Sequence, residues 1–276
     1  MGVWMSRCFA VLRVLGVVGV VAAGCGRETA RSRVVAVAAA ADLSQALPVI
    51  VREFRVRHPD IEVRPTFGAS GTLHAQISNG APFDLYLAAD IAYPQSLADE
   101  GLAKPEAVFR YGTGRLVIWI PNAFNAGSPK TLDPPVSTGG LDTLLLDPAI
   151  RRIAIANPRH APYGRAAEAA LAHFGLRETL AEKIVFAANV AEAAQFVQSA
   201  AADAAMIALA LAESPAMKSQ GRFWLVPADA HPPLVQGGVV LAAARDPEAA
   251  RLFADFLVAA EGRGILRSHG FDVGGD

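Results

Sequence analysis

Short apolar runs alternate along the chain with stretches in which apolar residues recur every three or four positions. The short runs are bounded by Gly, Pro or polar residues and predict buried β-strands, whereas the periodic stretches predict amphipathic helices. The runs lie at residues 34–39, 62–65, 83–90 and 115–121 and again within the repeated units 152–175 and 183–211. This alternation predicts an α/β protein with largely parallel sheets.

The first predicted helix follows the strand at residues 34–39 and begins at Asp42. Asp42 and Gln45, three positions apart, resemble a capping box, in which the first side chain binds free N–H groups at the helix start. Pro48 falls inside the same periodic stretch, so we expect a kink or a loose first turn.

Two later helices carry similar start signals. Asn189 is followed three positions later by Glu192, which repeats the capping-box spacing. Asp246 is followed by Pro247, and proline is favoured at the first helical position because its missing N–H would be unpaired there. We therefore expect helices that begin directly after Asn189 and Asp246.

The first 24 residues are typical of an export signal. Arg7 and Arg13 precede an unbroken run of small and apolar residues at positions 14–23. This run is about half the length that a membrane-spanning helix needs. The run ends in "AAGC", which looks like a bacterial lipoprotein box with Cys25 as the lipidated first residue of the mature chain. The alternative is plain secretion with an ordinary leader cysteine. Residues 25–33 are polar and predict a tether.

Composition narrows the chemistry of the folded body. Charged residues make up 18% of the chain and the net charge is -1, which argues against a nucleic-acid groove and favours a small-molecule or protein partner. Cys8 and Cys25 are the only cysteines, so the mature body has no disulfide and no cysteine chemistry. The six histidines lack metal-site spacing, and the chain has no Walker, G-x-S-x-G or H-E-x-x-H motif. We expect neither a free metal cation nor catalysis.

A chain of 276 residues is long enough for two lobes or for one large α/β domain. Two candidate crossovers, near residues 115–140 and at residues 234–244, favour the two-lobed arrangement. The first lobe is then residues 34–115 with 236–276, and the second lobe is residues 116–235.

Four strand-to-helix loops, two in each predicted lobe, are candidates for ligand binding: residues 41–42, 69–71, 162–164 and 189–190. Such loops lie at the carboxyl ends of strands, where open α/β sheets bind ligands. Each presents free backbone N–H groups and the positive end of a helix dipole, so together they could hold an oxyanion without a basic side chain. Each loop taken alone is equally compatible with ordinary capping or turn formation.

The sequences around these loops resemble the periplasmic molybdate-binding proteins, the ModA family of ABC-importer receptors. The specific stretch is "FGASGTLHAQISNGAPFDLYLAAD" at residues 67–90, supported by "AAADLSQAL", "APYG", "ANVAEAAQF" and "ILRSHGF". The resemblance implies a two-lobed flytrap, the periplasmic-binding-protein fold, in which each lobe is a mostly parallel sheet flanked by helices. It also implies a receptor that captures molybdate or tungstate and delivers it to an inner-membrane permease.

The resemblance also implies a ligand set. The small hydroxyl or amide residue of the first loop corresponds to Asp42, the hydroxyl of the second loop to Ser70, and the tyrosine hydroxyl of the third loop to Tyr163. The fourth loop contributes the backbone N–H of Val190. A tyrosine found in another branch of the family corresponds to Ala208 and is absent here.

Asp42 departs from the family pattern because a carboxylate would repel an anion. Two unit charges about 4 Å apart at an effective dielectric constant near 20 repel by roughly 4 kcal/mol, and a dianion doubles this cost. We therefore expect Asp42 to offer its backbone N–H to the ligand and to turn its carboxylate back onto Ser44 or Gln45.

The sequence thus predicts an exported, lipid-anchored and monomeric receptor for molybdate or tungstate that contacts the membrane only through its anchor and binds no nucleic acid. The alternative is a receptor for another small anion or solute, with Asp42 altering the specificity. Enzymes and transcription regulators also use this fold. An enzyme would need a catalytic acid or a cofactor-bearing cysteine in the cleft, and a transcription regulator would need a DNA-binding domain.

Overall fold

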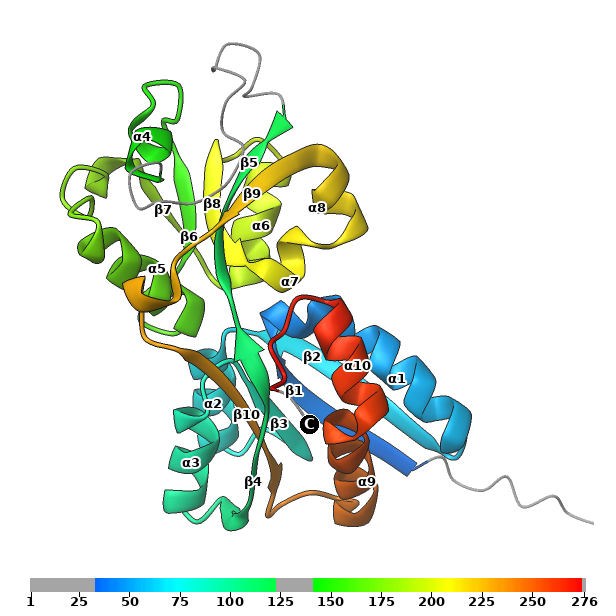
Figure 1. Cartoon of the computed structure of the whole chain (residues 1–276). Helices are drawn as coiled ribbons and strands as arrows, with labels where there is room; N and C mark the ends of the chain where they lie inside the picture. Colours follow the sequence, from blue (N-terminus) through cyan, green and yellow to red (C-terminus); the bar gives the residue numbers. More distant parts are fainter. Residues whose placement is uncertain (1–32, 123–140, 275–276) are drawn as a thin grey trace, which may run out of the picture. The chain divides into compact units, whose positions relative to one another are not determined.

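A computed structural model describes residues 33–122 and 141–274. The predicted signal segment, Cys25 and nearly all of the tether lie outside these residues. The described chain forms two five-stranded sheets flanked by helices (Figure 1). The chain passes from the first sheet to the second between two strands separated only by Arg115, and it returns through the segment that joins β9 to β10.

The first sheet has the strand order β2-β1-β3-β10-β4. The pairs β1–β2 and β1–β3 are parallel, whereas β10 is antiparallel to both of its neighbours because it enters the sheet from the opposite end. The strands are β1 (Arg33–Ala40), β2 (Ile61–Gly68), β3 (Leu85–Ala88), β4 (Ala103–Gly114) and β10 (Leu234–Leu241).

The second sheet has the strand order β7-β6-β8-β5-β9. Here β6 pairs in parallel with β7 and β8, and β5 runs antiparallel to β8 and β9. The two-lobed α/β prediction is confirmed, but the prediction of largely parallel sheets is not: each sheet has two parallel and two antiparallel pairings. The strands are β5 (Leu116–Pro121), β6 (Ile153–Ala156), β7 (Ile184–Ala187), β8 (Ala204–Ala208) and β9 (Gly221–Leu225).

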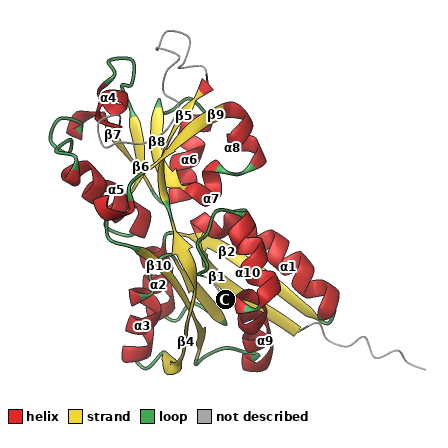
Figure 2. Cartoon of the chain, in the orientation of Figure 1, coloured by secondary structure: helices red, strands yellow, loops and turns green. Residues whose placement is uncertain are grey.

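Helices cover both sheets (Figure 2). Among the described residues, no helix is long and apolar enough to cross a membrane. The α-helices are α1 (Ala46–Arg57), α2 (Ser70–Ser78), α3 (Ala92–Asp99), α4 (Leu141–Leu146), α5 (Pro162–His173), α6 (Val190–Gln198), α7 (Leu209–Ala212), α8 (Pro215–Gln220), α9 (Pro247–Val258) and α10 (Ala260–Ser268). The 3-10 helices are η1 (Ala41–Ser44), η3 (Ala181–Lys183) and η4 (Ala228–Ala230).

The alternation of side chains along a strand places apolar residues on both faces of the first sheet. One face packs against α1, α9 and α10, where Phe54 meets Phe253 edge to face at 5.1 Å between ring centroids. The other face packs against α2 and α3, with Leu73 and Leu97 in the core. Within β10, Val240 joins the first core and its neighbour Val239 the second, so this strand is buried on both sides.

The first helix differs from the sequence prediction. Asp42 lies in η1, and α1 begins only at Ala46, with no side-chain hydrogen bond capping either segment. The predicted capping box and the turn of the Asp42 carboxylate onto Ser44 or Gln45 are therefore wrong. Pro48 explains the late start, because as the third residue of α1 it lacks an N–H where no intrahelical partner exists.

The other two predicted helix starts are confirmed. The Asn189 side chain accepts hydrogen bonds from the N–H groups of Ala191 and Glu192, each at 3.0 Å. The Asp246 carboxylate accepts from the N–H of Ala249 at 2.9 Å, with Pro247 as the first residue of α9. Both caps act within three residues, which is why the sequence predicts them correctly.

Candidate functional site

The four predicted loops meet around one small cavity. Its lining comes from the start of η1, the β2–α2 loop, the residue after β3, the start of α5 and the start of α6. The four residues singled out in the sequence, Asp42, Ser70, Tyr163 and Val190, all belong to this lining. Three of these elements follow strands of the first sheet and two follow strands of the second, so loops far apart in sequence converge.

Asp42 is fully buried, with 0% of its surface exposed. Its Oδ2 atom accepts a hydrogen bond from Nε2 of Gln236 on β10 at 2.5 Å. Its Oδ1 atom is buried and has no hydrogen-bond partner among the described residues. The carboxylate thus bonds a side chain of β10, two strands away from β1 in the sheet, instead of capping its own helix.

Burial raises the pKa of Asp42 from an ordinary 3.8 to about 6. The charged form loses water on burial, and hydrogen bonds from Gln236, from the Tyr163 hydroxyl and from the N–H groups of Asp42 and Leu43 recover only part of that loss. Asp42 therefore changes its charge close to neutral pH.

Ser70 is held by two backbone contacts. Its hydroxyl oxygen accepts a hydrogen bond from the N–H of Ala89 at 3.0 Å, and its carbonyl accepts from the Tyr86 hydroxyl at 2.6 Å. A serine hydroxyl has one proton to donate besides its acceptor sites. Because Ala89 occupies an acceptor site, the Ser70 hydroxyl proton remains available to a ligand in the cavity.

Tyr163 and Gln236 form the back of the site beside the β4–β5 connection. Gln236 is fully buried, and its Nε2 atom also donates to the Tyr163 hydroxyl at 3.4 Å. A methyl group added to Gly114 would lie 2.1 Å from the Tyr163 hydroxyl and 2.7 Å from Gln236 Nε2. Only glycine at this position leaves room for both side chains.

Backbone N–H groups complete the donor set. The first N–H groups of a helix have no intrahelical partner. At α6 the Asn189 side chain binds the second and third of these groups, on Ala191 and Glu192, and so leaves that of Val190 for the cavity. Among the described residues, none of those lining the cavity is a Lys, Arg or His. The arrangement therefore offers neutral donors to an anion.

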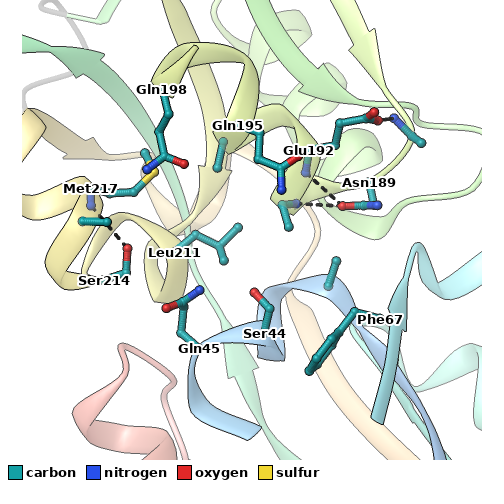
Figure 3. A pocket seen from close by; sticks show the side chains of 15 residues that line it. Ser44, Gln45, Phe67, Asn189, Glu192, Gln195, Gln198, Leu211, Ser214 and Met217 are labelled. Carbon is teal, nitrogen blue, oxygen red and sulfur yellow. Dashed lines mark hydrogen bonds between the residues drawn. The ribbon is translucent and has the colours of Figure 1, made fainter. Parts of the chain in front are cut away.

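A larger pocket of about 530 Å³ adjoins the small cavity and shares Ala41 and Asn189 with it. Figure 3 shows Gln45 and Ser44 on one side of this pocket and Gln195 on the other, so its walls combine uncharged amides and hydroxyls with apolar side chains such as Phe67 and Met217. Glu192 contributes the one carboxylate to the lining, and this carboxylate accepts from the N–H of Ala188.

The basic side chains near the third loop, those of Arg159, His160 and Arg165, do not line the small cavity. Arg165 on α5 binds Asp90 at 2.6 Å and the Tyr93 hydroxyl at 2.9 Å, and these contacts join the second lobe to the first. The carbonyl of His160 accepts from the N–H of Gly71 at 2.8 Å, which is a second such contact. The Arg159 N–H is bound by Asn157. Within the described ranges, no cluster of three or more potential metal ligands occurs.

Comparison with known proteins places this site in a family. A family model described as "Bacterial extracellular solute-binding protein" matches residues 35–272. The chain belongs to this family. As a bacterial extracellular solute-binding protein it is a receptor that acts outside the cytoplasm, and it is not an enzyme.

The solute-binding protein has relatives among named molybdate-binding proteins, which confirms the resemblance to the ModA family. It is 31% identical over 265 residues to the molybdate-binding protein ModA of Azotobacter vinelandii, covering 96% of this chain and 99% of that one. ModA of Rhodobacter capsulatus is 32% identical over 205 residues, 74% of this chain and 75% of that protein. The solved periplasmic molybdate-binding protein of A. vinelandii has a TM-score of 0.76 at 30% identity and covers 87% of this chain and 100% of its own.

Sequence reasoning missed Gln236 of this solute-binding protein. The residue lies 194 positions from Asp42 in a run that reads as an ordinary buried strand. A glutamine within the apolar run "LVQGGVVL" was the available signal, because a buried amide needs hydrogen-bond partners.

Proposed function

We propose that this protein captures molybdate, or tungstate, in the small cavity and supplies it to an ABC-transporter permease in the inner membrane. The supporting observation is the convergence of four helix starts on one cavity lined by neutral donors. The relatives named as molybdate-binding proteins support the choice of ligand. Asp42, Ser70, Tyr163 and Val190 are the proposed ligand-binding residues.

Neutral donors suit a receptor that must later release its ligand. Helix starts and hydroxyl groups stabilise an anion through partial charges, without adding a full positive charge that would bind any anion tightly. Specificity over sulfate then follows from size, because a cage spaced for the larger oxyanion cannot bring all its donors to a smaller one. The cavity holds about 10 Å³, roughly the space of one water molecule, so the loops must move apart to admit a tetrahedral oxyanion.

The two-lobed division explains how such movement can occur. We propose that residues 34–115 with 236–276 form one lobe and residues 116–235 the other. The strands of the two sheets separate at these boundaries, and the β4–β5 and β9–β10 connections are the links about which the lobes move. The protein works in this proposal as a monomer.

We further propose that residues 1–24 are removed on export, that Cys25 is lipidated and that residues 25–33 tether the body to the membrane. The supporting sequence is "AAGC" at residues 22–25. One relative, 25% identical over 236 residues, is named as a putative ABC transporter substrate-binding lipoprotein of Bacillus subtilis. Metabolic labelling with a fatty-acid probe is expected to mark the wild-type chain and to leave Cys25→Ser unlabelled.

Calorimetric titration of the purified mature protein tests the proposed ligand. We expect binding of molybdate and tungstate, with sulfate and phosphate much weaker at neutral pH. Ser70→Ala removes one hydrogen-bond donor from the cavity. A hydrogen bond to a charged group contributes about 1.5–3 kcal/mol, so we expect molybdate affinity to fall about tenfold or more. Ser96→Ala, which removes an exposed hydroxyl on α3, is the matched control and is expected to leave binding unchanged. Binding of sulfate with no binding of molybdate would overturn the proposal.

A further inference from the structure

We propose that Asp42 makes this site specific for an oxyanion that is bound together with one proton, shared between Asp42 Oδ1 and an oxygen of the anion. This inference rests on the proposed function, since it assumes that the oxyanion occupies the small cavity. It assigns to Asp42 a role that a hydroxyl or amide residue at the same position cannot have.

The geometry singles out Oδ1 as the atom that meets the ligand. Asp42 lines the cavity and is fully buried, and its Oδ2 is engaged by Gln236. Oδ1 is left without a partner among the described residues. Buried polar atoms in native structures are nearly always paired, so an unpaired carboxylate oxygen at a ligand cavity indicates that the ligand supplies the partner.

Among the described residues, no cation contributes to the pKa of Asp42. The titratable groups that interact with it are the hydroxyls of Tyr163 on α5 and Tyr111 on β4. The charged groups on the elements packed against η1 are engaged elsewhere: Glu192 of α6 binds the Ala188 N–H, and α7 carries no charged residue. On the remaining elements, ion pairs join Arg52 to Glu53 and Arg57 to Glu261 on α1, Glu62 to Arg64 on β2, and Arg33 of β1 to Asp246. Arg55 of α1 acts on Glu62.

An ionised Asp42 is incompatible with a bound dianion. Each pair of unit charges about 4 Å apart near a dielectric constant of 20 weakens binding by roughly a thousandfold, and the dianion carries two charges. The molecule avoids this loss if one proton enters with the ligand. Burial already holds the pKa of Asp42 at about 6, so the proton is taken up easily near neutral pH.

Protonation also improves the donor set. The Tyr163 hydroxyl is one of the groups that favour the ionised form of Asp42 and so lower its pKa. Once Asp42 is neutral, Oδ1 can donate its own proton to the anion and the Tyr163 hydroxyl is free to do the same. One proton therefore removes the repulsion and adds two donors.

The proposal separates oxyanions by the protons they carry. Molybdate and tungstate are unprotonated at neutral pH, so each must draw one proton from solution onto Asp42. Dihydrogenphosphate is a monoanion and brings a proton that the ionised Asp42 can share, so this form of phosphate needs no further proton from solution. Sulfate is also unprotonated at neutral pH, so its binding would require the same proton uptake as molybdate, and its smaller size gives it a poorer fit.

Calorimetric titration of the mature protein with molybdate in two buffers of different ionisation enthalpy tests this inference, because the difference in heat counts the protons taken up. At about pH 8 we expect the wild type to take up close to one proton per molybdate. Its affinity is expected to fall about tenfold per pH unit above about pH 6, since the free protein must then be protonated on binding.

Asp42→Asn is the matched variant, because it keeps the shape and cannot ionise. We expect it to bind molybdate with no proton uptake and an affinity independent of pH, about a hundredfold tighter than the wild type at about pH 8. Asp42→Ser serves as a second variant if thermal unfolding shows that Asp42→Asn is misfolded, and it is expected to show the same loss of proton uptake.

The outcomes distinguish the two proposals. Molybdate binding by the wild type with no proton uptake and a flat pH dependence would overturn the shared proton and leave the proposed function intact. Absence of molybdate binding by the wild type and both variants between about pH 5 and about pH 8.5 would overturn the proposed function itself.

Discussion

Replacing Asp42 by Asn should change how the stability of the ligand-free protein depends on pH. The folded pKa of Asp42 is about 6, against an ordinary 3.8. Between these values the folded state binds more protons than the unfolded state, so the free energy of unfolding falls as pH rises and stays low above about pH 6. Asn at this position cannot titrate and removes this dependence.

The size of the effect follows from the two pKa values. Integration of the proton-binding difference gives a loss of about 1.4 kcal/mol in the wild type between about pH 5 and about pH 8. For a folded body of this size each kcal/mol corresponds to roughly 2–4 °C in Tm, so the wild type should lose about 3–6 °C relative to Asp42→Asn over this range.

Differential scanning calorimetry of both proteins at closely spaced pH values measures this quantity. The two proteins differ only at residue 42, so the difference in Tm isolates the contribution of Asp42. Asp255→Asn, at an exposed position on α9, controls for the loss of a carboxylate and should follow the wild type. A Tm difference between Asp42→Asn and the wild type that is constant from about pH 5 to about pH 8 would refute the argument that burial opposes ionisation of Asp42.

Three further substitutions test separate parts of the structure. Gly114→Ala places a methyl 2.1 Å from the Tyr163 hydroxyl, so we expect a loss of about 1–3 kcal/mol in stability and at least a tenfold loss of molybdate affinity; calorimetry showing unchanged affinity would remove Tyr163 from the site. Arg165→Gln breaks the ion pair with Asp90, in which the Arg165 side chain is 43% exposed and the Asp90 side chain 33% exposed. We expect the free energy of unfolding to fall by less than about 1 kcal/mol. In stopped-flow measurements the ligand should dissociate faster than from the wild type at low salt and at the same rate at high salt. Phe253→Ala should cost about 3–5 kcal/mol in denaturant unfolding while leaving affinity in the folded protein intact, and a cost below about 1 kcal/mol would contradict its place in the core.

The local sequence was sufficient where the interaction spans only a few residues. The caps at Asn189 and Asp246 bind N–H groups two or three positions away, and they were predicted correctly. The positions of strands such as β1, β3 and β5 follow from their apolar runs, because burial of a strand requires apolar side chains on its hidden faces. No such run predicted β4 or β9. The resemblance around residues 67–90 added the two-lobed arrangement and the ligand set, which composition and periodicity do not contain.

The prediction for Asp42 was wrong for a physical reason. A short polar residue before an apolar periodic stretch is a good cap by local rules. In the folded protein η1 intervenes before α1, and the carboxylate meets Gln236, which local rules cannot place beside it.

The sequence by itself therefore determined most of the strands and helices and their order, the later helix starts, the absence of cysteine chemistry in the body and the four loops from which a ligand site could be built. The tertiary structure alone decided that these loops surround one cavity, that β10 and β5 run antiparallel to their neighbours and that Asp42 bonds Gln236. Strand pairing depends on how distant segments pack, and a buried carboxylate takes its partner and its pKa from side chains that only the completed fold brings into contact.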